Sequence, residues 1–308
     1  MKSEILVVEH VTKRYGKHIA LNDVSFSVSD FPFGLVGPNG AGKTTLIKIL
    51  TGLIKRYDGR VSILGFDPRK DERKVKSKIG ISLEKPIFPD VNAIVFLRFV
   101  GELRGLDRKE AEKEAEELLK KVDLLKYKNV SLSAFSAGML QRFSIAQAVI
   151  GFPELVILDE PMSNLDPSGR LMLVRLLKEI EKDVYLFIST HSLIDLQEVA
   201  STVAFMKKGK ILHIDKIERM FSEYYTVYEI ASSAPEVLAE VFSQDDNVLG
   251  LNVEGEKVVF RVRSGSDFIN VLIDITDRRK IKVYDITRKT VTLYDLYKKY
   301  IGEGEGEV

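Results

Sequence analysis

The chain contains no cysteine, no long hydrophobic run and no excess of charge of one sign. The absence of cysteine excludes disulfides, thiol nucleophiles and zinc–thiolate sites. Acidic and basic side chains almost cancel, and the net charge of +1 gives no general argument for binding nucleic acid or an anionic membrane. No apolar run reaches the length of a membrane span, and the acidic start is no signal peptide. Any membrane role is therefore expected to require a partner chain.

A phosphate-binding loop lies early in the chain, between an apolar run and a segment of helical character. The run at 33–36 predicts a buried strand, and residues 46–50 predict the first turns of a helix. Glycines in such a loop let several backbone N–H groups surround one anion, and the helix N-terminus adds positive charge. We expect Lys43 to bind the β- and γ-phosphates of a nucleoside triphosphate and Thr44 to ligate Mg²⁺. The predicted nucleotide-binding loop consists of Gly37, Pro38, Asn39, Gly40, Ala41, Gly42, Lys43, Thr44 and Thr45.

A second motif consists of an apolar strand that ends in two acids. Residues 155–158 are consecutively apolar, which is typical of a parallel strand buried on both faces. The C-terminal ends of such strands present ligand-binding groups in α/β sheets. Asp159 is therefore predicted to hold Mg²⁺ through water, and Glu160 to polarise the attacking water. The presence of a phosphate loop in the same chain favours this interpretation over an acidic turn.

Strand-like and helical segments alternate up to about residue 215, which predicts an α/β sheet. Beyond that point the pattern changes to a small α+β domain of ordinary size. The Gly-Glu repeat at 302–307 is expected to be disordered. Strands are expected at 5–8, 23–28, 61–64, 79–83, 155–158 and 184–188, and helices at 92–103, 107–122, 136–150 and 167–180.

A third motif, FSAGMLQR, occupies residues 135–142. Its serine can cap a helix whose free N–H groups would receive a phosphate, although alone the octapeptide fits any capped helix. With the two motifs above, it resembles the signature sequence of the nucleotide-binding subunits of ATP-binding cassette (ABC) transporters, and the resemblance covers roughly residues 4–215. Phe135 and Ala137 replace the usual leucine and glycine, whereas Ser136 and Gly138 are kept. The resemblance implies that Ser136, Ala137 and Gly138 contact the γ-phosphate bound to the opposite subunit.

Other positions match the same family. Asp166 ends a segment, SNLD, that matches the loop through which two such subunits contact each other, and it also suits a helix N-cap. His191 matches the family's histidine that contacts the γ-phosphate. Tyr15 matches the aromatic residue that stacks on adenine, although an aromatic side chain there could instead cover a core edge. His10, His18 and His213 match no motif and are expected to be surface or structural residues.

One position departs from the family pattern. After the strand at 79–83 the family normally has a glutamine that senses Mg²⁺ and faces the membrane subunit, whereas this chain has Glu84. A carboxylate can ligate Mg²⁺, but it adds negative charge beside the triphosphate. Exporter-type members tolerate this replacement, so Glu84 is kept as a candidate metal ligand.

The resemblance implies a fold. We expect a P-loop NTPase cassette of the α/β class at residues 1–215, with a mixed sheet and a helical signature subdomain at about 85–150. A small α+β accessory domain is expected at 216–308, and residues 292–297 look like the closing helix of the accessory domain in export-type subunits.

The resemblance also implies a function. The chain would bind and hydrolyse ATP with Mg²⁺, as a homodimer or heterodimer of cassettes. It would drive a separate polytopic membrane permease, with export favoured, and lie at the cytoplasmic face of the membrane. The segment 84–99, where Pro86, Ile87 and Phe88 are apolar, is the expected docking site for the permease.

Two alternatives remain. A soluble ABC ATPase acting in translation or on DNA is disfavoured, because the chain has a single cassette and no long heptad run, and no nucleic acid is expected as partner. A regulatory module with an inactive site is disfavoured by the intact Lys43, Asp159, Glu160 and His191.

Overall fold

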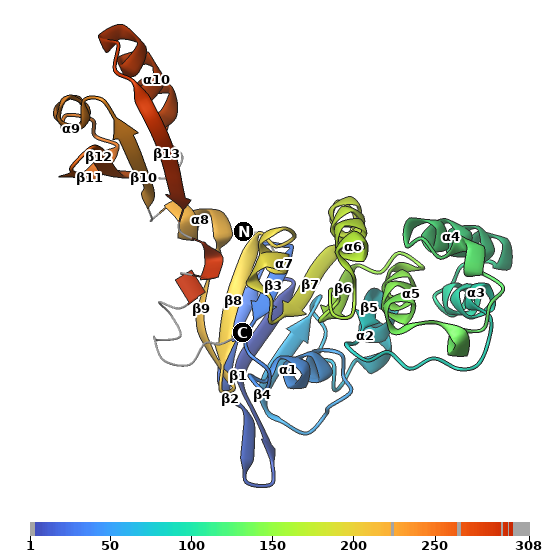
Figure 1. Cartoon of the computed structure of the whole chain (residues 1–308). Helices are drawn as coiled ribbons and strands as arrows, with labels where there is room; N and C mark the ends of the chain where they lie inside the picture. Colours follow the sequence, from blue (N-terminus) through green and yellow to red (C-terminus); the bar gives the residue numbers. More distant parts are fainter. Residues whose placement is uncertain (1–3, 223–224, 264–265, 291, 295, 298–308) are drawn as a thin grey trace. The chain divides into compact units, whose positions relative to one another are not determined.

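The computed structural model describes residues 4–222, 225–263, 266–290, 292–294 and 296–297 (Figure 1). The chain divides into two compact units, with the boundary between Ile214 and Asp215. The tail expected to be disordered lies outside the described residues, as does part of the expected closing helix at 292–297.

The first unit is built on a six-stranded sheet in the order β5-β6-β7-β3-β8-β9. From β5 to β8 each neighbouring pair is parallel, so the carboxyl ends of these strands meet at one edge. At this edge Asp159 pairs with Ser189, and Val36 pairs with Thr190. The strands are β3 (Phe33–Val36), β5 (Ile79–Ser82), β6 (Leu155–Asp159), β7 (Tyr185–Thr190), β8 (Thr202–Lys207) and β9 (Lys210–Lys216).

A second, antiparallel sheet has the order β2-β1-β4, with β1 at Leu6–Tyr15, β2 at His18–Val28 and β4 at Asp58–Ile63. The strands predicted at 5–8 and 23–28 are therefore too short. Both strands run on to a tight hairpin, in which Tyr15 pairs with His18 and Gly16 has a φ of +57°. The extensions carry mostly polar side chains, so apolar patterning detected only the outer ends of the hairpin.

Helices fill the connections between the strands of the first unit. Several begin at residues whose side chains satisfy free backbone N–H groups: Asp107 and Glu110 form a capping box, and Ser136 and Asp166 are N-caps. The helices are α1 (Lys43–Leu50), α2 (Glu72–Lys78), α3 (Ala93–Leu103), α4 (Arg108–Lys121), α5 (Ala137–Val149), α6 (Pro167–Ile180) and α7 (Leu193–Gln197).

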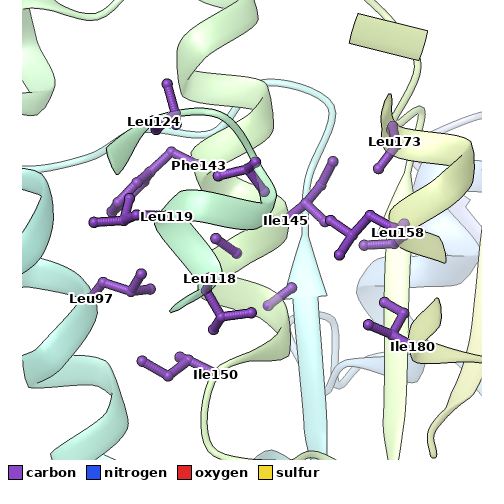
Figure 2. Packing of buried hydrophobic residues seen from close by; sticks show 14 of the residues in the cluster. Leu97, Leu118, Leu119, Leu124, Phe143, Ile145, Ile150, Leu158, Leu173 and Ile180 are labelled. Atoms are coloured by element: carbon purple, nitrogen blue, oxygen red, sulfur yellow. The ribbon is translucent and has the colours of Figure 1, made fainter. Parts of the chain in front are cut away.

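Strand β6 takes part in two hydrophobic cores. Val156 and Leu158 belong to the cluster formed with α3, α4, α5 and α6, and Figure 2 shows Leu158 beside Ile145, Leu173 and Ile180. Leu155 and Ile157 point the other way, into the cluster formed with α1 and the antiparallel sheet. This alternation follows from the two-residue period of a strand. All five residues of β6 are buried, so Asp159 ends, and Glu160 directly follows, a strand that is packed on both faces.

The second unit contains a four-stranded antiparallel sheet in the order β11-β12-β10-β13. The chain order is strand, helix, strand, strand, helix, strand, which is the split βαβ topology. Its core contains Tyr228, Phe242, Phe260 and Phe268, and every member of that cluster comes from this unit. The elements are α8 (Ile217–Ser222), β10 (Tyr225–Ser232), α9 (Pro235–Phe242), β11 (Val248–Glu254), β12 (Lys257–Arg263), α10 (Phe268–Arg279) and β13 (Val283–Thr290).

The contact between β5 and α5 yields a stability prediction. A Cβ atom at Gly80 would lie 1.8 Å from the carbonyl oxygen of Ala148, so Gly80→Ala must push strand and helix apart. We predict a loss of about 3 kcal/mol or more in the free energy of unfolding of the first unit, measured by urea titration with far-UV circular dichroism. Gly250→Ala is the control, because the nearest atom, Arg261 Cδ, would lie 3.9 Å away. Equal stability of the two variants would contradict this account.

Candidate nucleotide-binding site

A cleft of about 390 Å³ lies over the N-terminus of α1. It is lined by the phosphate loop, by one residue after β5, by one residue after β6 and by the β1–β2 hairpin. The first three segments come from distant parts of the sequence and meet because the carboxyl ends of the parallel strands lie at one edge, whereas the hairpin belongs to the antiparallel sheet. The lining residues are Tyr15, His18, Ala20, Asn39, Gly40, Ala41, Gly42, Lys43, Thr44, Thr45, Glu84 and Glu160.

The glycines of the loop are required by its close packing. A Cβ atom at Gly37 would lie 2.2 Å from the carbonyl oxygen of Met206, so β8 leaves no room for a side chain. Gly42 has a φ of +110°, and a Cβ atom there would lie 2.6 Å from the carbonyl oxygen of Ala20. The loop thus follows a path that other residues cannot take, with α1 beginning directly after it. Helix N-termini of this kind bind phosphate through their free N–H groups.

Glu160 joins two other predicted catalytic residues in one network. Its Oε1 lies 3.2 Å from Lys43 Nζ, and its Oε2 lies 2.8 Å from His191 Nδ1. The ammonium of Lys43 also donates to the carbonyl oxygen of Gly37 at 2.6 Å. Lys43 and Glu160 are both 6% exposed, so each charge depends on the other for compensation. The structure therefore brings the three predicted catalytic groups into direct contact.

Glu160 has an unusual backbone conformation. Its φ is +50°, in the left-handed region that side-chain-bearing residues rarely adopt. Its N–H donates to the carbonyl oxygen of Ser189 at 3.0 Å, and its carboxylate also accepts from the N–H of His191 at 3.3 Å. The end of β7 thus holds this residue in a strained geometry, and such strain is common at functional sites.

Asp159 lies beside Glu160 and contacts the phosphate loop. Its Oδ2 accepts from the Thr44 hydroxyl at 2.9 Å, and its Oδ1 accepts from the Ser189 hydroxyl. Burial raises the pKa of the Asp159 carboxyl above its usual range, and this outweighs the two hydroxyl hydrogen bonds, which lower it. The neighbouring carboxylates of Glu160 and Glu84 raise the pKa further. A cation at this position would relieve that unfavourable arrangement of negative charge.

The oxygen donors of this corner fit Mg²⁺. Thr44 and Asp159 offer adjacent hydroxyl and carboxylate oxygens, which this ion prefers. Among the residues that the structure describes, no cluster of three or more acidic, histidine or cysteine side chains could hold a metal alone. Mg²⁺ at nucleotide sites needs only one or two protein ligands, because phosphates and water complete its coordination. Glu84 lines the same cleft and adds a third oxygen donor at its rim.

The hairpin side of the cleft contains one predicted residue and one that sequence reasoning missed. Tyr15 is 48% exposed, and Lys13 Nζ lies 4.8 Å from the centroid of its ring. His18, which was expected to be a surface or structural residue, pairs with Tyr15 across the hairpin and lines the cleft. The turn-forming Gly16 was the available signal, because a hairpin closed there places His18 opposite Tyr15.

Comparison with known proteins agrees with this geometry. The sequence profile of the ABC transporter family matches residues 21–163. The uncharacterized ABC transporter ATP-binding protein YxlF of Bacillus subtilis is 31% identical over 304 residues, which cover 96% of this chain and 99% of YxlF. The linearmycin resistance ATP-binding protein LnrL of the same organism is 33% identical over 213 residues, 68% of each chain. A solved ATP binding subunit of an ABC transporter superposes with a TM-score of 0.65 at 27% identity, covering 71% of this chain and 92% of that structure.

The chain belongs to the ABC transporter ATP-binding proteins. It is therefore a P-loop ATPase, and its first unit has the α/β cassette fold predicted from the sequence. Among the residues that the structure describes, no helix is both long and apolar enough to cross a membrane.

The signature residues of this ABC protein lie apart from its own cleft. Ser136 is exposed and caps α5, where its hydroxyl accepts from the N–H of Met139 at 3.3 Å. Ala137 is exposed, and a Cβ atom at Gly138 would lie 3.1 Å from the carbonyl oxygen of Asn164. Asp166 caps α6 by accepting from the N–H of Gly169 at 3.0 Å. None of these residues lines the cleft, so their contact with nucleotide remains a prediction that requires a second cassette.

The expected docking segment needs one correction. Phe88 is only partly exposed, because its ring packs against Phe96 and Phe143 at centroid distances of 5.5 and 5.1 Å. Ile87 is 95% exposed, and Val95, Phe99 and Leu103 are exposed at four-residue spacing along α3. The three exposed apolar residues on α3, Val95, Phe99 and Leu103, are called the α3 stripe. Ile87 and Phe88 are adjacent apolar residues in a short loop, so the sequence pattern could not predict which of them packs inward.

The position of Tyr15 yields a prediction about nucleotide affinity. Tyr15→Ala should weaken ATP binding about tenfold, because stacking of a base on an aromatic ring contributes roughly 1–3 kcal/mol. Tyr15→Phe, which keeps the ring, should bind within about threefold of the wild type. Fluorescent-nucleotide titration with Mg²⁺ measures both, and Tyr284→Ala, a 62% exposed tyrosine of the second unit, is the control. Unchanged affinity in Tyr15→Ala would assign the ring to hairpin packing instead.

Proposed function

We propose that this chain is the ATP-hydrolysing subunit of a transporter whose membrane-spanning part is a separate chain, and that transport is outward. The observation that carries the proposal is the position of Glu160, held between Lys43 and His191 and adjacent to the Asp159–Thr44 pair. A buried carboxylate at the mouth of a phosphate loop is suited to orienting a water for attack on a phosphoryl group.

The side chains divide the work of hydrolysis. Thr44 and Asp159 would hold Mg²⁺, which neutralises charge on the β- and γ-phosphates when it is bound. Lys43 exchanges its contacts with Gly37 and Glu160 for phosphate oxygens, which leaves Glu160 Oε1 free to accept a hydrogen bond from the attacking water. His191 donates through Nδ1 to Glu160 Oε2 and so keeps the carboxylate oriented.

Completion of the site would come from a second cassette, identical or different. ABC cassettes in general work as pairs, and the exposed N-terminus of α5 offers unpaired N–H groups suited to a γ-phosphate. Ser136, Ala137 and Gly138 of one subunit would then close the cleft of the other, with Asp166 at the contact between them. Hydrolysis would reopen the pair.

Glu160→Gln tests this mechanism. We predict hydrolysis at least about 100-fold slower, because the amide cannot accept a proton from the attacking water. ATP-dependent association should persist, as measured by size-exclusion chromatography with light scattering. Glu154→Gln is the control, since Glu154 forms an exposed pair with Lys78 at the other end of β6. Intact hydrolysis in Glu160→Gln, without ATP-dependent association, would refute the mechanism.

A permease would dock on the α3 stripe and transmit dimer closure to the membrane. Helix α3 is the first helix after Glu84, so the stripe is connected in sequence to a residue that lines the nucleotide cleft. Outward transport is supported by the similarity to LnrL, a resistance protein, because resistance suits removal of a compound from the cell. The chain would thus lie at the cytoplasmic face of the membrane, bound through its partner.

Phe99→Glu tests the docking surface. A charge in an apolar contact should abolish co-purification of the membrane partner from detergent-solubilised native membranes, while ATP binding by the isolated chain stays unchanged. Phe152→Glu is the matched control, because Phe152 is 76% exposed and lies in the turn between α5 and β6. If Phe99→Glu recovers the membrane protein as well as the wild type does, the docking surface lies elsewhere.

A further inference from the structure

The end of β7 and the residue after it contact Asp159, Glu160 and the phosphate loop. His191 contacts Glu160, and the carbonyl oxygen of Thr190 accepts from the N–H of Gly37 at 3.3 Å. Ser189 contacts both Asp159, the last residue of β6, and Glu160, the next residue. Neither the motifs nor the family resemblance singled out Ser189 for a role of its own.

Ser189 is completely buried and its hydroxyl is fully used. Its Oγ donates to Asp159 Oδ1, and the N–H of Glu160 points to the same Oγ at 3.4 Å. The carbonyl oxygen of Ser189 accepts from that same N–H at 3.0 Å. One residue therefore holds the carboxylate of Asp159 and the backbone of Glu160 together.

The consequence for Asp159 is a fixed orientation. A carboxylate on a buried strand can rotate about its terminal bond, and each rotation changes which oxygen faces Thr44. With Oδ1 bound to Ser189, only Oδ2 is presented to Thr44, on the side of the phosphate loop. Outer hydrogen bonds of this kind orient metal-binding carboxylates in proteins and affect how tightly they bind the ion.

We propose that Ser189 is a positioning residue for Mg²⁺: its hydroxyl turns Asp159 so that Oδ2 and Thr44 Oγ1 together meet the nucleotide-bound ion. This rests on the proposed function, since it assumes that the cleft takes a nucleotide with Mg²⁺. The competing account is that Ser189 only satisfies a buried carboxylate. If Ser189 positions the metal ligand, its removal weakens metal binding and leaves metal-free nucleotide binding unchanged. If Ser189 only satisfies a buried carboxylate, its removal does not weaken metal binding selectively.

The test uses the full chain and Mn²⁺ as a spectroscopic substitute for Mg²⁺. Binding of Mn²⁺ to the complex with a non-hydrolysable ATP analogue is titrated by electron paramagnetic resonance for the wild type, Ser189→Ala and Ser189→Cys. Affinity for the same analogue is measured in EDTA, and thermal melting confirms folding. Ser144→Ala is the control, because it also removes a buried serine hydroxyl. That hydroxyl forms a hydrogen bond with Ser82 Oγ at 2.8 Å, and neither residue lines the cleft.

We expect Ser189→Ala to weaken Mn²⁺ binding about tenfold or more, with metal-free nucleotide affinity within about twofold of the wild type. Ser189→Cys keeps a weak donor of similar shape and should lie between the two, and it replaces Ser189→Ala if that variant does not fold. Ser144→Ala should match the wild type.

Three results would overturn the inference. Wild-type Mn²⁺ affinity in the folded variants would mean that Ser189 does not position the ligand. An equal loss of metal-free nucleotide binding would mean that Ser189 only supports the loop. Failure of the wild type to bind the nucleotide analogue at all would overturn the proposed function together with this inference.

Discussion

The parallel pairing of β6, β7 and β3 determines where Lys43, Asp159, Glu160 and His191 lie. Asp159 sits opposite Ser189, and Val36, the last residue before the phosphate loop, sits opposite Thr190. Because a strand advances about 3.3 Å per residue, a slip of one residue would move a carboxylate farther than the length of a hydrogen bond. The contacts among Lys43, Glu160 and His191 therefore depend on the register of the sheet as well as on the identity of the side chains.

Much of this site could be predicted from local sequence. Lys43, Thr44, Asp159 and Glu160 stand at points where a strand becomes a loop or a helix, and short apolar runs mark those points clearly. His191 was placed by its order in the chain relative to the other motifs. These signals are local, and the carboxyl ends of parallel strands converge whatever the intervening segments do.

The rest depended on contacts that a local pattern does not encode. The length of the β1–β2 hairpin, and with it the place of His18, follows from pairing of strands that carry mainly polar side chains. Phe88 and Ile87 are neighbours of similar character, yet one packs on Phe143 and the other is exposed. The left-handed backbone of Glu160 and the two bonds made by Ser189 arise only when β6 and β7 lie side by side.

The separate core of the second unit has a consequence for the sequence evolution of such a chain. Each residue in that cluster is supplied by the second unit itself, whereas β6 is shared by the two clusters of the first unit. A substitution in β6 changes the packing of one of the two clusters and of the strand that ends in Asp159. Natural selection therefore acts on such a substitution through its effect on the whole cassette. Phe260 belongs to a cluster in which, among the residues that the structure describes, no cleft-lining residue takes part, so substitutions there can accumulate without altering the packing beneath the catalytic residues.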